Sequence, residues 1–287
     1  MPPDYRTRFA PSPTGYLHLG HAYSAMIAAG RASAAGGSFL LRIEDTDSAR
    51  CRPEYEAAIY QDLAWLGLEW PEPVLRQSEH LDRYDTALKQ LIALGVCYPC
   101  HCSRSDIRAA LSAPQEGVSH LTPDGMLYPG TCRGRAMAAG SNRDAIRLDM
   151  ARAIALTGDV SRLGFVETGP NWPGQQQLEA AALLGNIGDI VLARRDIGTA
   201  AYHLAVVVDD ALQGITEVVR GQDLQDATPV HRLLQGLLGL PTPGYHHHAL
   251  IRDDQGKRLA KRDDARAIRS YREAGASPQD IRRMVGL

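Results

Sequence analysis

The sequence of 287 residues lacks any apolar run near the length of about 20 residues that a membrane-spanning helix requires. Its first residues contain no hydrophobic core of a secretion signal. Net charge is nearly absent as well: the formal value is −2, which argues against a protein that coats nucleic acid through positive charge alone. We therefore expect a cytoplasmic protein that makes no contact with membranes.

Cysteine is scarce and odd in number: there are five, and three of them lie between positions 97 and 102. A domain held by paired disulfides is therefore not expected, and in a cytosolic chain such crowding favours a metal site. The remaining composition is ordinary, with 44% hydrophobic and 22% charged residues, which excludes a disordered or fibrous chain. The length suits one large or two modest domains.

The order of the apolar runs predicts an α/β fold. Residues 6–10 and 39–43 read as short strands, and a turn at 11–15 leads into an alanine-rich helical pattern at 19–35. Strands that alternate with helices in this way indicate a parallel sheet covered by helices. The β-branched run at 204–208 is typical of a strand buried on both faces. Further helices are expected at 53–66, 81–94, 105–111 and 229–238, and further strands at 145–149, 164–167 and 216–219.

The stretch from 8 to 21, RFAPSPTGYLHLGH, passes from a strand through a turn into a helix. A helix N-terminus offers free N–H groups and a positive dipole end to an anion. His18 and His21 share one face of the first turn and can donate to a phosphate, while Gly20 leaves room for a flat ring. This stretch resembles the HIGH motif of class I aminoacyl-tRNA synthetases, in the glutamyl and glutaminyl form. The resemblance implies that His18, Gly20 and His21 bind ATP and that the two histidines are catalytic.

A second cluster of cations, GKRLAKR at 256–262, suits a loop that clamps phosphates. It resembles the KMSKS loop of the same synthetases, with Lys261 in place of the second lysine. Arg258 and Ala260 depart from that pattern, where lysine and serine are usual. The resemblance implies that Arg258 and Lys261 bind ATP and that Lys261 assists departure of pyrophosphate.

Three charged side chains stand at or near the ends of predicted strands: Arg8, Glu44 and Arg220. Ligands of open α/β sheets bind at strand ends, and guanidinium groups grip carboxylates with two hydrogen bonds. Taken alone, each residue could equally form a surface salt bridge. The resemblance implies a glutamate pocket in which two arginines hold carboxylates and Glu44 holds the ammonium group. Its expected members are Arg8, Ala10, Ser12, Glu44, Tyr202 and Arg220.

Cys100 and Cys102 are followed at a distance by Cys132, and three thiolates can bind zinc and close a loop that lacks a core. The candidates for a fourth ligand are Tyr128, His101, His120 and Cys97. Without further context the histidines rank first, because tyrosinate is a rare zinc ligand. Glutamyl-queuosine tRNA(Asp) synthetases carry zinc on C-x-C and Y-x-x-x-C, and the resemblance implies Cys100, Cys102, Tyr128 and Cys132 as ligands.

Two other polar tracts are set aside. His246, His247 and His248 are adjacent, so on a strand their side chains alternate between faces and cannot chelate one ion together; His247 is expected to face the nucleotide. Asp209 and Asp210 could hold Mg²⁺ but are not included among the site residues.

Together these features predict a Rossmann-type parallel sheet that binds nucleotide, with a zinc-containing insertion and a short helical C-terminal segment. We expect catalytic halves at 1–97 and 191–250, an insertion at 98–190 that contacts tRNA, and a C-terminal segment at 251–287 that carries the second ATP motif. The sequence ends soon after Lys261, where full glutamyl synthetases continue into an anticodon reader.

The resemblance therefore implies a ligase that activates glutamate with ATP and Mg²⁺ and transfers it to queuosine in the anticodon of tRNA(Asp). Two alternatives stay open: a compact glutamyl-tRNA synthetase that charges the 3′ end of tRNA(Glu), and a catalytically silent paralogue. We expect a monomer.

Overall fold

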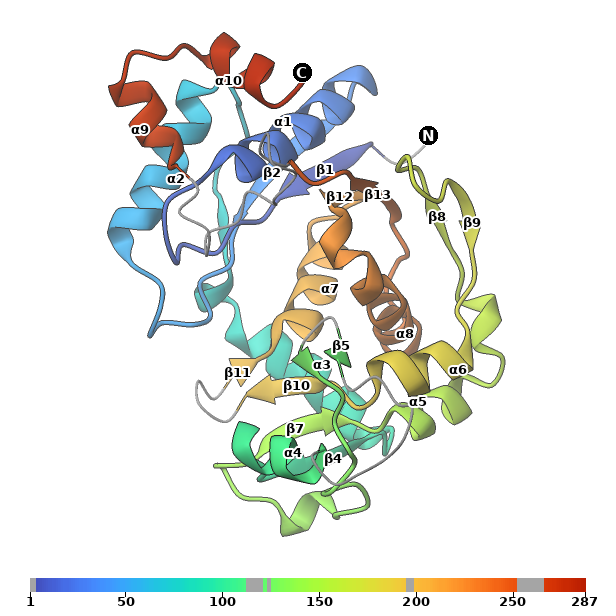
Figure 1. Cartoon of the computed structure of the whole chain (residues 1–287). Helices are drawn as coiled ribbons and strands as arrows, with labels where there is room; N and C mark the ends of the chain where they lie inside the picture. The colour runs from blue at the N-terminus through green and yellow to red at the C-terminus, as the bar shows by residue number, and fades with distance from the viewer. Residues whose placement is uncertain (1–3, 112–120, 123–124, 195–198, 252–265) are drawn as a thin grey trace.

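Residues 4–111, 121–122, 125–194, 199–251 and 266–287 are described by the computed structural model of the chain (Figure 1). Among these residues, no helix combines the length and the apolar character needed to span a bilayer.

The first half of the parallel sheet contains β1 (Arg6–Phe9), β2 (Ser38–Ile43) and β3 (Leu75–Arg76), which lie parallel in that order. Helix α1 (Leu19–Ala34) connects the first two strands, and α2 (Pro53–Trp65) follows the second. The strands and helices predicted for this region are confirmed. Helix α2 begins at the expected signal, a proline in its first turn.

The second half of the sheet contains β12 (Glu217–Gly221) and β13 (Gly244–His248), followed by β8 (Phe165–Glu167) and β9 (Gly174–Gln176). The first three of these are parallel and β9 is antiparallel. The two halves meet where Thr216 N donates to Arg6 O at 3.0 Å, just before β12 and beside β1. Parallel strands from both halves therefore end on the same side, where ligands of such sheets bind.

The predicted strand at 204–208 is wrong: these residues lie in helix α7 (Tyr202–Leu212). Nearly every position from 203 to 210 is buried, because α3 (Leu81–Ala93) and α8 (Thr228–Leu238) pack against the helix. A helix covered on all sides has no polar face, so its apolar run cannot be told from a buried strand by periodicity.

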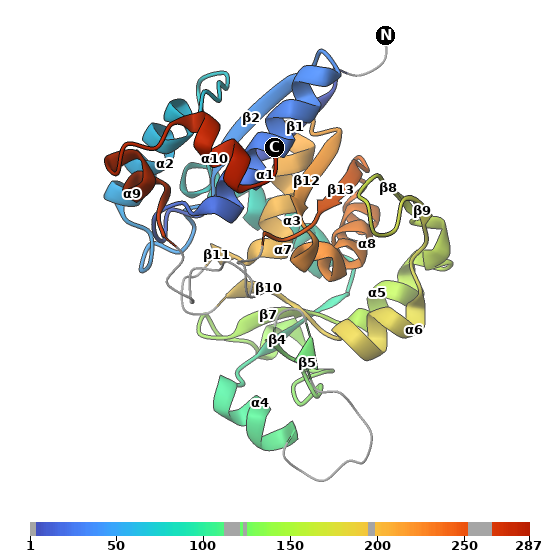
Figure 2. The ribbon, with the colours of Figure 1, turned by 45° about the horizontal axis from the view of Figure 1, so that its top comes forward.

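A separate sheet has the order β11 (Thr199–Ala200), β10 (Val191–Arg194), β7 (Ala145–Leu148) and β4 (Cys97–Cys100), and its described pairs are antiparallel. It lies below the parallel sheet in Figure 1, and α4 (Arg104–Leu111) lies at its far end in Figure 2. The stretch 98–142 contains the short helix expected at 105–111, which is observed as α4. It also contains most of β4, whose partner β7 is more than forty residues away.

The C-terminal residues form α9 (Ile268–Glu273) and α10 (Pro278–Met284), which pack beside α2 and α1 (Figures 1 and 2). Ile268 and Ile281 are fully buried in the same apolar cluster as α1 and the strands of the first half. The expected helical C-terminal segment is confirmed for 266–287. The remaining elements are α5 (Met150–Thr157), α6 (Ala180–Ala182), β5 (Leu121–Thr122), β6 (Gly125–Met126), the 3-10 helices Gln77–Glu79, Met137–Ala139, Val160–Arg162 and Gln222–Ala227, and the π-helical turn Leu183–Ile187.

Candidate functional site

The N-terminus of α1 is capped by the two predicted histidines. His18 is the N-cap, and its Nδ1 accepts from Gly20 N at 3.1 Å; His21 Nδ1 accepts from His18 N at 3.3 Å. The ring centroids lie 3.8 Å apart. A ring nitrogen that accepts a backbone N–H carries no proton, so in the neutral imidazoles the proton is on Nε2. The cap therefore makes each Nε2 a donor, as phosphate binding requires.

The second ATP motif falls outside the described residues, and with it Arg258, Ala260 and Lys261. The chain that follows this motif is anchored at the first one: Ala267 forms a β-bridge with His18, and Ile268 N donates to Leu17 O at 2.8 Å. Ala267 and Ile268, which follow the second motif, are thus held directly beside the histidine cap.

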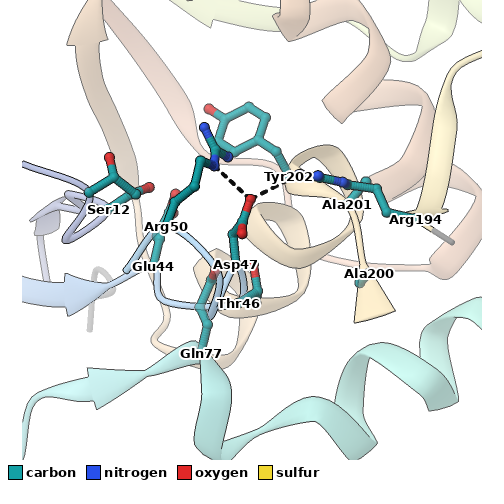
Figure 3. A pocket seen from close by; sticks show the side chains of 11 residues that line it. Ser12, Glu44, Thr46, Asp47, Arg50, Gln77, Arg194, Ala200, Ala201 and Tyr202 are labelled. Carbon is teal, nitrogen blue, oxygen red and sulfur yellow. Dashed lines mark hydrogen bonds and ion pairs between the residues drawn. The ribbon is translucent and has the colours of Figure 1, made fainter. Parts of the chain in front are cut away.

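A pocket opens between the loop after β2 and the N-terminus of α7 (Figure 3). It brings together three of the predicted glutamate-binding residues: Ser12, Glu44 and Tyr202. Ala10, Arg8 and Arg220 are not part of its lining. The other lining residues are Thr14, Thr46, Asp47, Arg50, Gln77, Arg194, Ala200 and Ala201.

Behind Glu44 lies a network of buried charges. Arg8 donates from Nε and one Nη to Asp210, at 2.9 and 3.1 Å. Arg42, fully buried, donates to Asp210 at 2.8 Å and to Glu44 at 3.3 Å. Burial raises the pKa of Glu44, although Arg42 and Arg8 oppose the change. Burial would raise the pKa of Asp210 too, but Arg8 and Arg42 hold it below its ordinary value.

Two residues set aside in the sequence therefore have a structural role. Asp210 accepts hydrogen bonds from both Arg8 and Arg42, and Asp209 accepts hydrogen bonds from Gln77 at 2.8 Å and Tyr84 at 2.9 Å. Both carboxylates are thus engaged by side chains of the chain itself, and two of these partners, Arg42 and Gln77, connect them to the pocket residue Glu44 and to the pocket lining.

Arg220, at the end of β12, stands behind Tyr202. Its Nη1 lies 3.4 Å from the Tyr202 hydroxyl, and its Nη2 donates to Thr228 at 2.8 Å. The Arg8 Nη1 atom lies 3.4 Å from Val219 O, one residue before Arg220. The two predicted carboxylate-binding arginines thus belong to neighbouring strands, and both contribute positive charge behind the pocket.

Sequence reasoning missed the charged rim of the pocket. Asp47 Oδ2 lies 2.7 Å from Arg50 Nε and 3.4 Å from Arg194 Nη1, as the dashed lines in Figure 3 show. Asp47 and Arg50 follow a predicted strand, and the position of strand ends could have indicated them. Arg194 comes from β10 in the other sheet, and nothing in its local sequence indicates that it reaches this pocket.

The three predicted cysteine ligands do converge. The sulfurs of Cys100, Cys102 and Cys132 all lie within 4.8 Å of one another. The Tyr128 hydroxyl lies 3.4 Å from Cys100 Sγ and 3.5 Å from Cys102 Sγ. Zn–S bonds of about 2.3 Å and Zn–O bonds of about 2.0 Å require such separations around one tetrahedral ion. The four atoms therefore fit a zinc ion.

The other candidates for a fourth ligand fit less well. Cys97 is buried in the main apolar core, and burial raises its pKa to about 12. His101 Nδ1 lies 3.7 Å from Cys132 Sγ but only 3.0 Å from Arg135 Nη1. His120 falls outside the described residues.

Hydrogen bonds to Asp189 help to hold the cluster in place. Arg133, next to Cys132, donates to buried Asp189 at 2.8 Å, and Tyr98 donates to the same carboxylate at 2.5 Å. The Arg147 guanidinium lies 3.8 Å above the Tyr128 ring. The cluster is therefore fixed to β4 and β7 by polar contacts as well as by packing.

Comparison with known proteins identifies the family. Residues 4–126 and 175–287 match the model for tRNA synthetases class I (E and Q), catalytic domain. The chain is 55% identical over 284 residues to glutamyl-Q tRNA(Asp) synthetase from Rhodobacter capsulatus, covering 98% of this chain and 99% of that one. It is 42% identical to the protein of the same name from Symbiobacterium thermophilum, covering 96% and 83%.

A solved structure shows the same fold. The crystal structure of a glutamate tRNA ligase from Elizabethkingia meningosepticum, in complex with its amino acid, matches with a TM-score of 0.68 and 29% identity. The match covers 91% of this chain and 52% of that one, so the chain spans about half the length of that ligase.

Proposed function

The chain belongs to the glutamyl-Q tRNA(Asp) synthetases, which are class I synthetases and ligases, and on this basis we propose that it activates glutamate with ATP and transfers it to queuosine in tRNA(Asp). One observation carries the proposal: 55% identity over nearly the whole length of both chains to a protein of that name. Because the proposed acceptor is a tRNA, we place the reaction in the cytoplasm.

The pocket supports glutamate as the amino acid. Glu44 lines it and offers a carboxylate for the ammonium group, while Tyr202 offers a hydroxyl. Arg220, 3.4 Å from that hydroxyl, supplies a guanidinium for a substrate carboxylate. Arg8 gives two of its three nitrogens to Asp210, so in this structure it acts on the pocket through its charge. Ala10 and Ser12 complete the proposed set.

Activation requires an in-line attack of the glutamate α-carboxylate on the α-phosphate of ATP, giving glutamyl-adenylate and pyrophosphate. The Nε2 donors of His18 and His21 suit the charge that develops on the α-phosphate. Gly20 allows the nucleotide to approach, and Arg258 and Lys261 supply cations for the departing pyrophosphate. Mg²⁺, when bound with ATP, neutralises phosphate charge. No side-chain nucleophile is needed.

In the second step a hydroxyl of the queuosine cyclopentenediol takes the glutamyl group from the adenylate and releases AMP. The segment 98–190 is proposed to contact the tRNA. Zinc on Cys100, Cys102, Tyr128 and Cys132 would hold that segment in shape, and the distances among these four atoms support the ligand set.

Pyrophosphate exchange tests the activation step. The wild-type chain is expected to exchange labelled pyrophosphate into ATP with glutamate, and at least about tenfold more slowly with glutamine, since discrimination of one charge contact is worth roughly 1.4 kcal/mol. Glu44→Gln is expected to reduce exchange to a similar degree. Absence of exchange with glutamate would contradict the proposal and favour a silent paralogue.

A further inference from the structure

Arg220 is enclosed by two buried histidines that neither ATP motif contains. Its Nε donates to His247 Nε2 at 3.0 Å, and its Nη1 lies 3.2 Å from His231 Nδ1. The histidine rings come from β13 and α8, so two successive elements of the chain meet at one guanidinium. His247 and His231 are each 2% exposed. Arg220 itself is 5% exposed, so contacts within the protein determine the orientation of its guanidinium.

These contacts determine where the histidine protons lie. A guanidinium is always protonated and only donates, so His247 Nε2 and His231 Nδ1 must both present lone pairs. Each ring is then neutral, with its proton on the other nitrogen. His247 Nδ1 donates that proton to Glu167 Oε2 at 2.5 Å, and His231 Nε2 donates to His203 Nδ1 at 3.0 Å.

Glu167 is itself held in one orientation. Its Oε1 accepts from Gly169 N at 2.7 Å and from His247 N at 3.0 Å. Only Oε2 is then directed at the His247 ring. The chain from Glu167 through His247 to Arg220 therefore has one consistent arrangement of donors and acceptors.

We propose that His247 and His231 are positioning residues that orient Arg220 toward a carboxylate of the substrate, and that Glu167 fixes the required tautomer of His247. This inference rests on the proposed function, because it assigns Arg220 to glutamate binding. With Nε held by His247, Nη1 by His231 and Nη2 by Thr228, the guanidinium cannot rotate, and its Nη1 edge stays beside Tyr202 of the pocket.

The electrostatics of the enclosure agree with neutral rings. Burial, and then the Arg220 charge, lower the pKa of His231 well below its ordinary value. Burial also lowers the pKa of His247, with the hydrogen bond to Glu167 opposing the change. Within the tract 246–248, His247 thus acts through Arg220. From the sequence, His247 is expected to face the nucleotide, whereas in the structure its ring contacts Arg220.

The test compares variants that keep the acceptor atom with variants that remove it, using the full chain and glutamate-dependent pyrophosphate exchange. Asparagine at 231 keeps an oxygen near the position of Nδ1, and glutamine at 247 keeps one near Nε2. His231→Asn and His247→Gln are expected to keep the KM for glutamate within about threefold of wild type. His231→Leu and His247→Leu are expected to raise it at least about tenfold, with the KM for ATP unchanged within about twofold.

Glu167→Gln provides an isosteric variant that decides the matter if the leucine variants fail to fold. The amide oxygen would take the two backbone N–H groups, and the amide nitrogen would then donate to His247 Nδ1. The ring proton would move to Nε2 and oppose the Arg220 donor. We expect the KM for glutamate to rise at least about fivefold while the KM for ATP stays unchanged.

The inference is overturned if Glu167→Gln leaves the KM for glutamate unchanged, or if the asparagine and glutamine variants lose as much affinity as the leucine variants. It is also overturned if both KM values rise together, which would indicate general damage to the fold. A wild-type chain without exchange would instead refute the proposed function, so the two failures are distinguishable.

Discussion

The pocket region and the cysteine cluster solve the same problem of buried polar groups in different ways. Behind the pocket, Arg8 and Arg42 form ion pairs with Asp210, Glu44 and Asp209, so each buried guanidinium has carboxylate partners within the chain. In the cluster, three thiols and a phenol converge, while Arg133 donates to Asp189 and Arg147 lies above the Tyr128 ring. The charged groups behind the pocket therefore already have partners within the chain, whereas the thiols and the phenol of the cluster are suited to bind a cation.

This difference indicates which of the two regions is expected to depend on a bound ligand for its stability. Removing one member of the ion network leaves a charge buried without its partner, which is costly whether or not substrate is present. Removing one member of the cysteine cluster removes a proposed zinc ligand, and the loss is expected to affect the binding of that ion and the order of the nearby chain. Three substitutions can break or sharpen this contrast.

The largest effect is expected for Asp210→Ala. This change leaves Arg8 and Arg42 without the carboxylate that both contact, at 2.9 and 2.8 Å. We expect the free energy of unfolding to fall by about 3–5 kcal/mol, as for other broken buried ion pairs. Urea unfolding measures it. Asp85→Asn, an exposed pair with Lys89, is the matched control and should change stability by less than about 0.5 kcal/mol. A loss below 1 kcal/mol for Asp210→Ala would contradict the account.

Asp62 sharpens the contrast, since it is a buried carboxylate with poor partners. Neither oxygen accepts a hydrogen bond from the described residues, although Arg272 Nη1 lies 3.2 Å away. Burial raises its pKa to about 6 from 3.8. Because the folded chain binds this proton more tightly, the stability that it contributes is present below about pH 4 and is lost as the pH rises through 6.

Asp62→Asn removes that titration. We expect it to be more stable than wild type at pH 8, by up to about 3 kcal/mol, with the difference shrinking as the pH falls to 4. Urea unfolding at intervals across this range provides the comparison. A variant less stable than wild type at pH 8 would show that the ion pair with Arg272 outweighs burial.

The smallest change in global unfolding is expected for Cys132→Ser, because the cluster is separate from both main apolar cores. Bound zinc should fall at least about tenfold, from about one ion per chain. Hydrogen exchange should become faster in β4 and β7 and stay unchanged in β1 and β2. Cys51→Ser, outside the cluster, is the control. Wild-type protein without zinc would remove the metal site from the account.

Local signals explain what could be predicted from the sequence. The histidine cap was found because a strand, a turn and a helix start adjoin within fourteen residues, and the cysteine ligands because their types and spacing are distinctive. Helix α7 was mistaken for a strand because burial on all sides removes the periodicity that separates the two.

Contacts over long sequence distances explain what could not be predicted. Arg8 is bound by Asp210 and Arg194 reaches Asp47, across separations of 202 and 147 residues. Nothing in the local sequence encodes such pairs. The tautomer imposed on His247 by Glu167 likewise depends on β8 and β13 lying side by side.

The transfer of labelled glutamate to two tRNA pools tests the central claim most directly, one pool from cells that make queuosine and one from cells that lack it. The account predicts label only on the queuosine-containing pool, in the tRNA(Asp) fraction. Equal labelling of both pools, in the tRNA(Glu) fraction, would contradict it and indicate a synthetase that charges the 3′ end.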